Sequence, residues 1–524
     1  MKFAVAALAV AVFAAGMHWG TFAAGGSDSY CYVQQAEQWA SGRLQVAEPL
    51  ALEAPWPNAP LTFAPAGHIP SPTVPGVAVP ICPAGLSIVM APFIWASRAA
   101  GVGDAGWVLV VPLFGALLIW ATYLLGSRFS PGVGLASAVV VACSPAFLFQ
   151  LMQPMSDVSA AALWVLAAAW ATSRSRHAPL MAGIATSVAI LVRPNLLPLG
   201  LVLAWWFVPY SDSGDGATQY SDSGDGATQG VESGRHRTLT PIAVFAAASA
   251  VGCVAVALIQ QMFYGSPFSS GYGSLTGLFA VSHIAPNALR YATWMWQSHT
   301  PVWLAALAAP FVLPRRLTAL LLTLAAVNVL CYLPYVVFND WWYVRFLLPA
   351  IAIVLVLTVA AIDALSRTTR VRVVLVSVAT SIVCLLFLRE ARARNVFDLH
   401  RLEARYERAG SYVATHLPPN ALVITSWESG SVRYYGHRTT LVWDVLDPAW
   451  LDRAIAYARG RGLEPYLLFE AWEEPMFRQR FAGSTIAKLD WPPAADIGAL
   501  VRIYRPEDRE RYLRGEAAPT EYAR

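Results

Sequence analysis

The chain has 524 residues, of which 56% are hydrophobic and only 13% are charged. A soluble protein carries charge on about a quarter of its residues, so this composition excludes an ordinary soluble protein and predicts a multi-pass membrane protein. The net charge of +4 at pH 7 comes without a clustered basic patch and gives no indication of DNA or RNA binding. The six cysteines form no CxxC pair, which indicates neither a zinc site nor a disulfide framework.

Apolar runs long enough to form transmembrane helices occur about eleven times along the chain. They cover residues 3–22, 106–126, 132–150, 157–173, 179–192, 195–209, 239–263, 300–314, 317–338, 346–365 and 372–388. We interpret the first run as an uncleaved span, with a signal peptide over residues 1–24 as the alternative. A further apolar run, residues 83–101, is short and opens with proline and glycine.

The arginines between these runs predict the orientation of the chain. They occupy positions 128, 174, 176, 235, 237, 315, 316, 367, 370 and 372. The positive-inside rule places such loops in the cytoplasm, and the spans alternate correctly only if residues 83–101 do not cross the membrane. We therefore expect 83–101 to form an interfacial or re-entrant helix, the N-terminus to be cytoplasmic, and the first outer loop to cover residues 25–105.

The loop at residues 210–237 contains the decapeptide YSDSGDGATQ twice without a change. Small polar residues bury little apolar surface, so this loop is predicted to be cytoplasmic and disordered. A calcium-binding interpretation of its aspartates lacks the closing glutamate at the required spacing.

Residues 391–524 have the pattern of a small α/β domain, which the predicted orientation places on the extracytoplasmic face. ALVITS (421–426), LEPYLLFE (463–470) and ALVRIYR (499–505) are predicted strands. The domain has no GxGxxG loop, P-loop or GxSxG elbow, so neither nucleotide binding nor hydrolase chemistry is indicated. We therefore expect the chemistry of the protein to lie in residues 1–390.

Two acids at the edges of predicted spans are candidate catalytic residues, because an acid near the bilayer is costly unless it serves a function. Asp28 follows the first span, and Asp157 follows a proline break in QLMQPMSDVSA (150–160). We expect Ser156 to cap the helix that begins at Asp157. The alternatives are a helix-capping acid for Asp157 and an ordinary solvated loop acid for Asp28.

Three motifs together resemble the GT-C family of membrane-embedded glycosyltransferases. They are GSDSYCY (26–32), PMSD (154–157) and WYVRFLLP (342–349), and their order and sidedness match the family over roughly residues 1–390. The resemblance implies an inverting transfer from a polyprenyl-phosphate-linked sugar to a glycan, lipid or protein acceptor of the cell envelope, with Asp28 as general base. The family often has a second acid after the first, whereas Ser29 stands here. No cofactor is therefore predicted, and a role for a divalent metal stays open.

A leaving lipid phosphate requires cations, and Arg345 is the preferred candidate because aromatic residues surround it near the predicted headgroup depth. Arg193 is a second candidate. The remaining predicted substrate-binding residues are Tyr30, Tyr32, His68, Tyr264 and Tyr272, the last two within MFYGSPFSSGYGS (262–274).

Other interpretations of the sequence stay open. A multi-pass transporter or flippase of lipid-linked saccharides would have repeated halves and acids near the bilayer midplane, and neither is evident. A polymerase- or ligase-like enzyme would have key arginines in a large late loop, where the chain has Arg290 alone. Cys31 and Cys82 both face the outer compartment, where a disulfide is allowed, but the position of Cys31 beside the presumed base argues against one.

Overall fold

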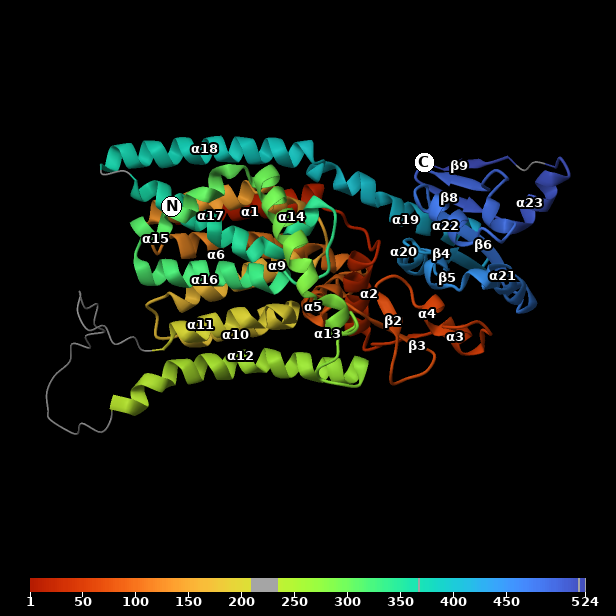
Figure 1. Ribbon diagram of the computed structural model, residues 1–524, viewed down its shortest axis with the longest axis horizontal. Helices are drawn as coiled ribbons and strands as arrows, with labels where there is room; N and C mark the ends of the chain where they lie inside the picture. Colours follow the sequence, from red (N-terminus) through yellow and green to blue (C-terminus); the bar gives the residue numbers. More distant parts are fainter. Residues whose placement is uncertain (209–233, 366–367, 517–518, 524) are drawn as a thin grey trace.

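The computed structural model describes residues 1–208, 234–365, 368–516 and 519–523. Long helices run side by side in one bundle, and a smaller α/β unit lies beyond one end of it (Figure 1). The repeated decapeptides of the predicted disordered loop lie outside the described residues.

The bundle is built from the apolar segments that the sequence predicts. Its helices are α1 (Lys2–Trp19), α6 (Val110–Gly126), α7 (Pro131–Cys143), α8 (Pro145–Leu151), α9 (Ser156–Ala171), α10 (Ala178–Val192), α11 (Leu197–Trp206), α12 (Gly234–Tyr264), α15 (Ala309–Val312), α16 (Arg315–Tyr332), α17 (Leu348–Ala364) and α18 (Thr369–Ala393).

Six helical segments of the described chain are long and apolar enough to cross a membrane, or seven if α7 and α8, which meet at a bend of 63°, count as one span. This corrects the expected count of about eleven. The predicted spans at 157–173, 179–192, 195–209 and 300–314 fall instead in apolar helices of 10–17 residues. A helix of 15 residues is about 23 Å long, which is less than the roughly 30 Å hydrocarbon core. Pro194 stands between two of these runs and Pro301 at the start of another, and both lie in the first turn of a helix, where proline is tolerated.

Helices α9 and α17 form the centre of the bundle. In the most apolar part of Trp341–Ala364, the segment that ends in α17, 83% of the residues are buried. Nearly every residue of α9 is buried against α6, α10 and α17. Helix α9 is rich in alanine and serine, and small side chains let helix backbones approach closely in a membrane protein. Residues at the ends of α9 and α17 are therefore held in fixed positions.

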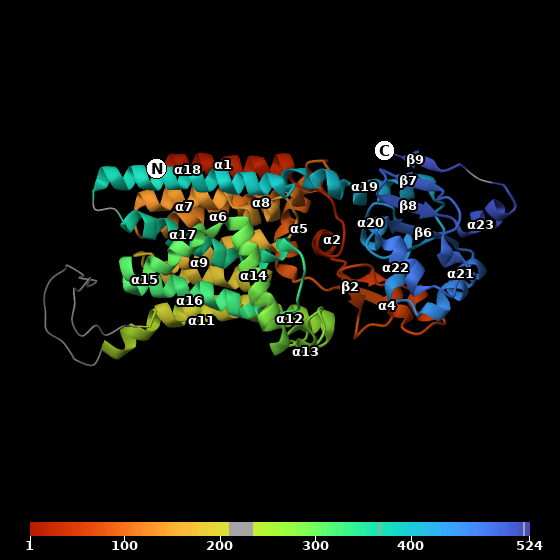
Figure 2. The same ribbon diagram turned by 45° about the horizontal axis from the view of Figure 1, so that its top comes forward.

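The segment between α1 and α6 folds into short elements at one end of the bundle. They are α2 (Asp28–Ser41), α3 (Leu50–Glu53), α4 (Ala59–Phe63), α5 (Ala84–Ala99), η1 (Ala105–Leu109) and an antiparallel sheet in the order β1 (Val46–Ala47), β3 (Val77–Pro80), β2 (His68–Pro70). Helix α5, the predicted interfacial segment, packs on α2 and α10 and lies at the end of the bundle that faces the α/β unit (Figures 1 and 2).

The segment after α12 begins at the same end, with α13 (Leu275–Leu278), η3 (Val281–His283) and α14 (Ile284–His299). Next, η4 (Pro301–Ala308) leads into α15, and η5 (Trp341–Leu347) leads into α17. The turn between α15 and α16 lies at the opposite end of the bundle, and so does the start of α18 (Figure 1). There Arg316 donates to the carbonyl of Trp206 at 3.2 Å, and Arg372 pairs with Asp363 at 3.7 Å.

The C-terminal unit contains a mixed six-stranded sheet in the order β5-β4-β6-β8-β7-β9. Its elements are η6 (Val396–Asp398), α19 (Leu399–His416), β4 (Ala421–Thr425), α20 (Ser429–Tyr434), β5 (Thr439–Val442), η7 (Trp443–Val445), η8 (Pro448–Trp450), α21 (Leu451–Gly460), β6 (Glu464–Glu470), α22 (Glu473–Arg480), η9 (Ile486–Lys488), β7 (Ala495–Ile497), β8 (Val501–Tyr504), α23 (Pro506–Leu513) and β9 (Glu521–Ala523). The three predicted strands correspond to β4, β6 and β8. The short strands β5, β7 and β9 carry too little pattern to be predicted.

Candidate active site

Two acids and two arginines from four separate segments meet at the end of the bundle that faces the C-terminal unit. Asp28 is the first residue of α2, and Asp157 is the second residue of α9. Arg193 follows the last residue of α10, and Arg345 lies in η5 just before α17. All four stand where a helix begins or ends, so the packing of the bundle brings them together.

Asp28 and Arg345 form the more exposed of two ion pairs. Nη2 of Arg345 lies 2.8 Å from Oδ2 of Asp28, with 10% of the arginine side chain and 38% of the aspartate side chain exposed. Arg345 also donates to the sulfur of Met155 at 3.2 Å, and its guanidinium lies 5.0 Å from the centre of the Tyr343 ring. The guanidinium thus has further contacts with Met155 and Tyr343, whereas the carboxylate of Asp28 is accessible to another molecule.

Asp157 and Arg193 form a buried pair, with 0% and 12% of their side chains exposed. Nη2 of Arg193 lies 2.7 Å from Oδ1 of Asp157, and Nη1 donates to the hydroxyl of Tyr332 at 2.9 Å. Removing one partner of such a pair leaves an uncompensated charge away from water. Asp157 is therefore more than a capping acid, because it neutralises a specific cation.

Ser156 does not cap α9, which corrects the expectation from the sequence. The cap position is Met155, and it makes no side-chain cap hydrogen bond. Because Ser156 lies inside the first helical turn, its hydroxyl is available to other segments. It lies 2.8 Å from the hydroxyl of Tyr32 and accepts from Nε of Arg193 at 3.3 Å.

Phe346 connects the two ion pairs. The guanidinium carbons of Arg193 and Arg345 each lie 5.3 Å from the centre of its ring. An aromatic face attracts cations, so one ring helps to hold two positive charges in neighbouring positions. The arrangement places two cations and two carboxylates around one small volume.

A cavity of about 440 Å³ opens beside this cluster. Its polar lining includes Tyr32, Arg193, Asn195, Gln260, Tyr264, Tyr272, Tyr332 and Tyr335. Phenylalanines and aliphatic residues of α12 and of the loop after it form much of the remaining wall. A mostly apolar cavity with convergent hydroxyls and one guanidinium fits a ligand that has an anionic group and several hydroxyls.

Seven of the nine predicted site residues come together at this cluster and cavity: Asp28, Tyr32, Asp157, Arg193, Tyr264, Tyr272 and Arg345. The structure does not bring Tyr30 and His68 there. Tyr30 is buried against Gly430 of the C-terminal unit, and the ring of His68 lies 5.3 Å from that of Tyr30. Burial lowers the pKa of His68 to about 3.

The helical geometry of α2 explains this division. Residues four apart lie on the same face of a helix, whereas residues two apart point in different directions. Asp28 and Tyr32 therefore share the face toward the cavity, and Tyr30 faces the C-terminal unit. The sequence alone places both tyrosines in the first outer loop (25–105) and does not distinguish them.

A disulfide joins Cys31 to Cys82, which corrects the expectation that these cysteines stay unpaired. The bond ties the first turn of α2 to the segment just before α5, and Cys82 itself lines the cavity. The position of Cys31 beside Asp28 was the argument against a bond. Asp28 pairs with Arg345 and Cys31 bonds to Cys82, so the carboxylate and the disulfide have separate partners.

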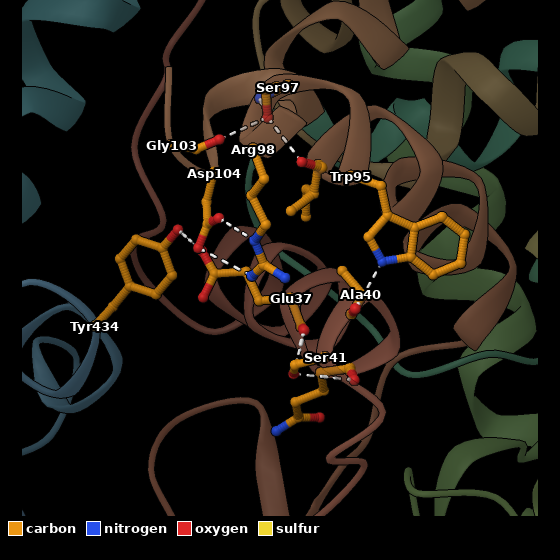
Figure 3. Close-up of polar contacts among 12 residues, drawn as sticks. Glu37, Ala40, Ser41, Trp95, Ser97, Arg98, Gly103, Asp104 and Tyr434 are labelled. Atoms are coloured by element: carbon orange, nitrogen blue, oxygen red, sulfur yellow. Dashed lines mark hydrogen bonds and ion pairs between the residues drawn. The ribbon is translucent and has the colours of Figure 1, made fainter. Parts of the chain in front are cut away.

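Further contacts hold the far end of α2 (Figure 3). Nε1 of Trp95 on α5 donates to the carbonyl of Ala40 at 2.6 Å. Glu37 accepts a hydrogen bond from Tyr434 of the C-terminal unit, and burial raises the pKa of Glu37 to about 7. Helix α2 is thus fixed to α5 and to the C-terminal unit, which positions Asp28 at its start.

Tyr332, Phe346 and Ser156 complete the site, and reasoning from the sequence did not select them as functional residues. Tyr332 stands at the end of an apolar helix with nothing in its neighbours to distinguish it. Ser156 and Phe346 lie within the motifs PMSD and WYVRFLLP, beside residues that were selected. Among the described residues, no three histidine, cysteine, aspartate or glutamate side chains gather where they could hold a metal ion.

No family model and no curated protein sequence matches the chain. Solved structures do. ArnT from Cupriavidus metallidurans bound to undecaprenyl phosphate is 14% identical, with a TM-score of 0.53 and coverage of 98% of both chains.

The oligosaccharyltransferase of Archaeoglobus fulgidus, tethered to an acceptor peptide, is 12% identical with a TM-score of 0.51, covering 92% of this chain and 71% of the other. The arabinofuranosyltransferase AftD from Mycobacteria is 15% identical with a TM-score of 0.50, covering 97% of this chain and 42% of the other. The protein therefore has the GT-C fold of membrane-embedded glycosyltransferases over nearly its full length.

Proposed function

We propose that the protein is an inverting glycosyltransferase that moves a sugar from a polyprenyl-phosphate-linked donor to a cell-envelope acceptor at the outer face of the membrane. The observation that carries this proposal is the accessible carboxylate of Asp28, paired with Arg345 beside a tyrosine-lined cavity. ArnT, similar in fold, binds undecaprenyl phosphate, and the similar oligosaccharyltransferase binds an acceptor peptide. These ligands support a lipid-linked donor and a separate acceptor here.

In the proposed reaction, Asp28 acts as the general base. The acceptor hydroxyl attacks the anomeric carbon and gives its proton to the carboxylate of Asp28. The bond between that carbon and the phosphate oxygen breaks with its electron pair leaving on the phosphate. A single displacement from the opposite face inverts the configuration at the anomeric carbon.

Arg345 and Arg193 are the proposed phosphate ligands, because two guanidiniums match the charge and the oxygens of a leaving phosphate. Arg345 pairs with Asp28 at 2.8 Å. A phosphate that binds Arg345 competes with Asp28 for the same N–H groups of the guanidinium. Binding of the lipid-linked donor would then release Asp28 from Arg345, so that Asp28 is free to act as the base only when the donor is bound.

The proposed orientation follows from charge. Arg316 and Arg372 stand at the end of the bundle opposite the C-terminal unit, and the positive-inside rule assigns that end to the cytoplasm. The N-terminus is then cytoplasmic, and residues 391–524 form an extracytoplasmic domain of an integral plasma-membrane protein. A transporter would place its charged residues near the middle of the bundle, whereas these lie at helix ends.

The test uses the full-length protein in membranes with a panel of radiolabelled polyprenyl-phosphate sugars. We expect one label to move to an envelope acceptor, and Asp28→Asn to lower the rate by about 10²- to 10⁴-fold with donor binding retained. Arg345→Ala is expected to weaken donor binding itself, because a phosphate contact exists already in the ground state. Asp363→Asn, at the opposite end of the bundle, is the matched control. Normal transfer by Asp28→Asn would refute the proposed role.

A further inference from the structure

Two neighbouring strands of the C-terminal sheet are each followed, after one intervening residue, by the dipeptide Trp-Glu. Strand β4 ends at Thr425 and is followed by Ser-Trp-Glu, which places Trp427 and Glu428 after it. Strand β6 ends at Glu470 and is followed by Ala-Trp-Glu, which places Trp472 and Glu473 after it. The two strands are parallel and hydrogen-bonded to each other, so both dipeptides lie beyond the carboxyl ends of the strands. We call this side of the sheet the sheet edge.

This edge is a favoured place for a ligand in an α/β fold. The chain passes from β4 to β5 on one side and then to β6 on the other side of β4. Ligands bind such folds outside the carboxyl ends of the strands where the strand order reverses. None of the described residues that line the cavity beside Asp28 belongs to the C-terminal unit, so this edge is a separate surface.

The two tryptophans leave apolar surface uncovered. Trp427 is 44% exposed and Trp472 is 48% exposed, and their rings lie 5.8 Å apart at an angle of 63°. The indoles of Trp443 and Trp491 in the same unit are buried. The exposed pair thus packs edge to face, with almost half of each residue open to solvent.

Buried carboxylates stand beside these two tryptophans. Glu473 is fully bonded, accepting from the amides of Trp427 at 3.3 Å and Glu470 at 2.8 Å. Glu470 accepts from Nε1 of Trp472 at 3.0 Å and pairs with Arg405 at 3.1 Å. Each of these contacts fixes part of the edge.

Glu428 differs from the other two acids. One of its oxygens accepts from Ser431, but Oε1 is buried without a hydrogen-bond partner among the described residues, and so is the hydroxyl of Thr425. Burial, with Glu470 and Glu473 nearby, raises the pKa of Glu428 to about 8. A buried polar atom without a partner is costly, and native proteins normally supply one from protein, water or ligand.

We propose that this sheet edge binds a sugar ring, with Trp427 and Trp472 as stacking surfaces and Glu428 as a hydrogen-bond partner of a hydroxyl. A pyranose has a C–H face that packs on an indole and hydroxyls at its rim that bond to a carboxyl group. A membrane headgroup would bring a phosphate beside the carboxylate of Glu470, whose partner Arg405 is already engaged. A cationic group is not needed, because Arg405 already supplies the positive charge of the cluster.

The position of the edge connects it to the proposed chemistry. Arg405 contacts Glu470, and the next residue, Tyr406, packs so closely on Gly25 that no side chain fits there. Gly25 lies three residues before Asp28. A saccharide held at this edge would therefore extend toward the start of α2. That it is the acceptor, and that the acceptor class is a glycan, rests on the proposed function.

The test measures sugar binding by the full-length protein in detergent, without donor. The probes are the methyl pyranosides of glucose, galactose, mannose and N-acetylglucosamine, followed by saturation-transfer NMR and tryptophan fluorescence. We expect saturable binding of at least one probe below about 100 mM, and a loss of about tenfold or more in affinity for Trp472→Ala and Glu428→Gln. Trp450→Ala, in the same unit, is the matched control and should bind normally.

The outcomes separate this proposal from the proposed function. Asp28→Asn keeps the sheet edge intact, so it should bind the probe like the unaltered protein even though it does not transfer sugar. If no probe binds saturably, or if Trp427→Ala and Trp472→Ala bind as well as Trp450→Ala, the sugar site is refuted. If these two variants lose partition into neutral lipid vesicles but keep sugar binding, the pair belongs to the membrane surface, and the proposal is also refuted.

Discussion

The two ion pairs of the candidate active site should respond in opposite ways to the same substitution. Asp157 is fully buried against Arg193, whereas Asp28 keeps 38% of its side chain exposed beside Arg345. Asp157→Asn leaves a guanidinium without its counterion away from water, which costs about 3 to 5 kcal/mol of folding free energy. Asp28→Asn should cost only about 1 kcal/mol, because water reaches the site and exposed pairs contribute little.

For activity the order should be reversed: Asp28→Asn, which loses little stability, should lose most of its transfer activity. Asp28→Asn is expected to lower transfer by about 10²- to 10⁴-fold while the protein stays folded. The double variant Asp157→Asn with Arg193→Gln removes both charges, so it should be more stable than Asp157→Asn alone. It should still transfer poorly, because a proposed phosphate ligand is missing.

The assay is chemical unfolding in detergent micelles, read as the free energy of unfolding by linear extrapolation, beside transfer of a radiolabelled sugar. Asp363→Asn is the control for a carboxylate that pairs with arginine at the opposite end of the bundle. The reasoning fails if Asp28→Asn destabilises the protein as much as Asp157→Asn. It also fails if the double variant is no more stable than Asp157→Asn.

Replacing Cys31 and Cys82 by serine opens a loop with a sequence separation of 51. By the chain-entropy relation this should lower the free energy of unfolding by about 4 kcal/mol. Equal thermal unfolding of the unaltered protein with and without reductant would contradict this. Burial raises the pKa of Glu428 from 4.5 to about 8, so the folded chain binds more protons than the unfolded chain between these values, and stability should fall as pH rises through them. Glu428→Gln should flatten that slope in unfolding measured across the range. Reporters fused after residues 103 and 237 should register outside and inside; an inside signal at 103 would reverse the proposed orientation.

Local pattern was enough to determine the class of the protein and much of its secondary structure. The apolar runs predict the helices of the bundle, and the short apolar runs in residues 421–426 and 463–470 predict β4 and β6, because hydrophobic pattern is a property of neighbouring residues. The resemblance carried by GSDSYCY, PMSD and WYVRFLLP also agrees with the fold similarity. The span count was wrong because several of the apolar runs form helices of only 10–17 residues, and hydropathy alone does not record where a helix ends.

Tertiary structure alone decided which of these residues meet. Asp28 and Arg345 are 317 positions apart, and their pairing depends on how α2 and η5 pack at the end of the bundle. The helical turn that begins at Asp28 sends Tyr32 toward the cavity and Tyr30 away from it, and it brings Cys31 within reach of Cys82. Side-chain contacts between distant segments follow from helix packing and helix direction, and neither is encoded in a short stretch of sequence.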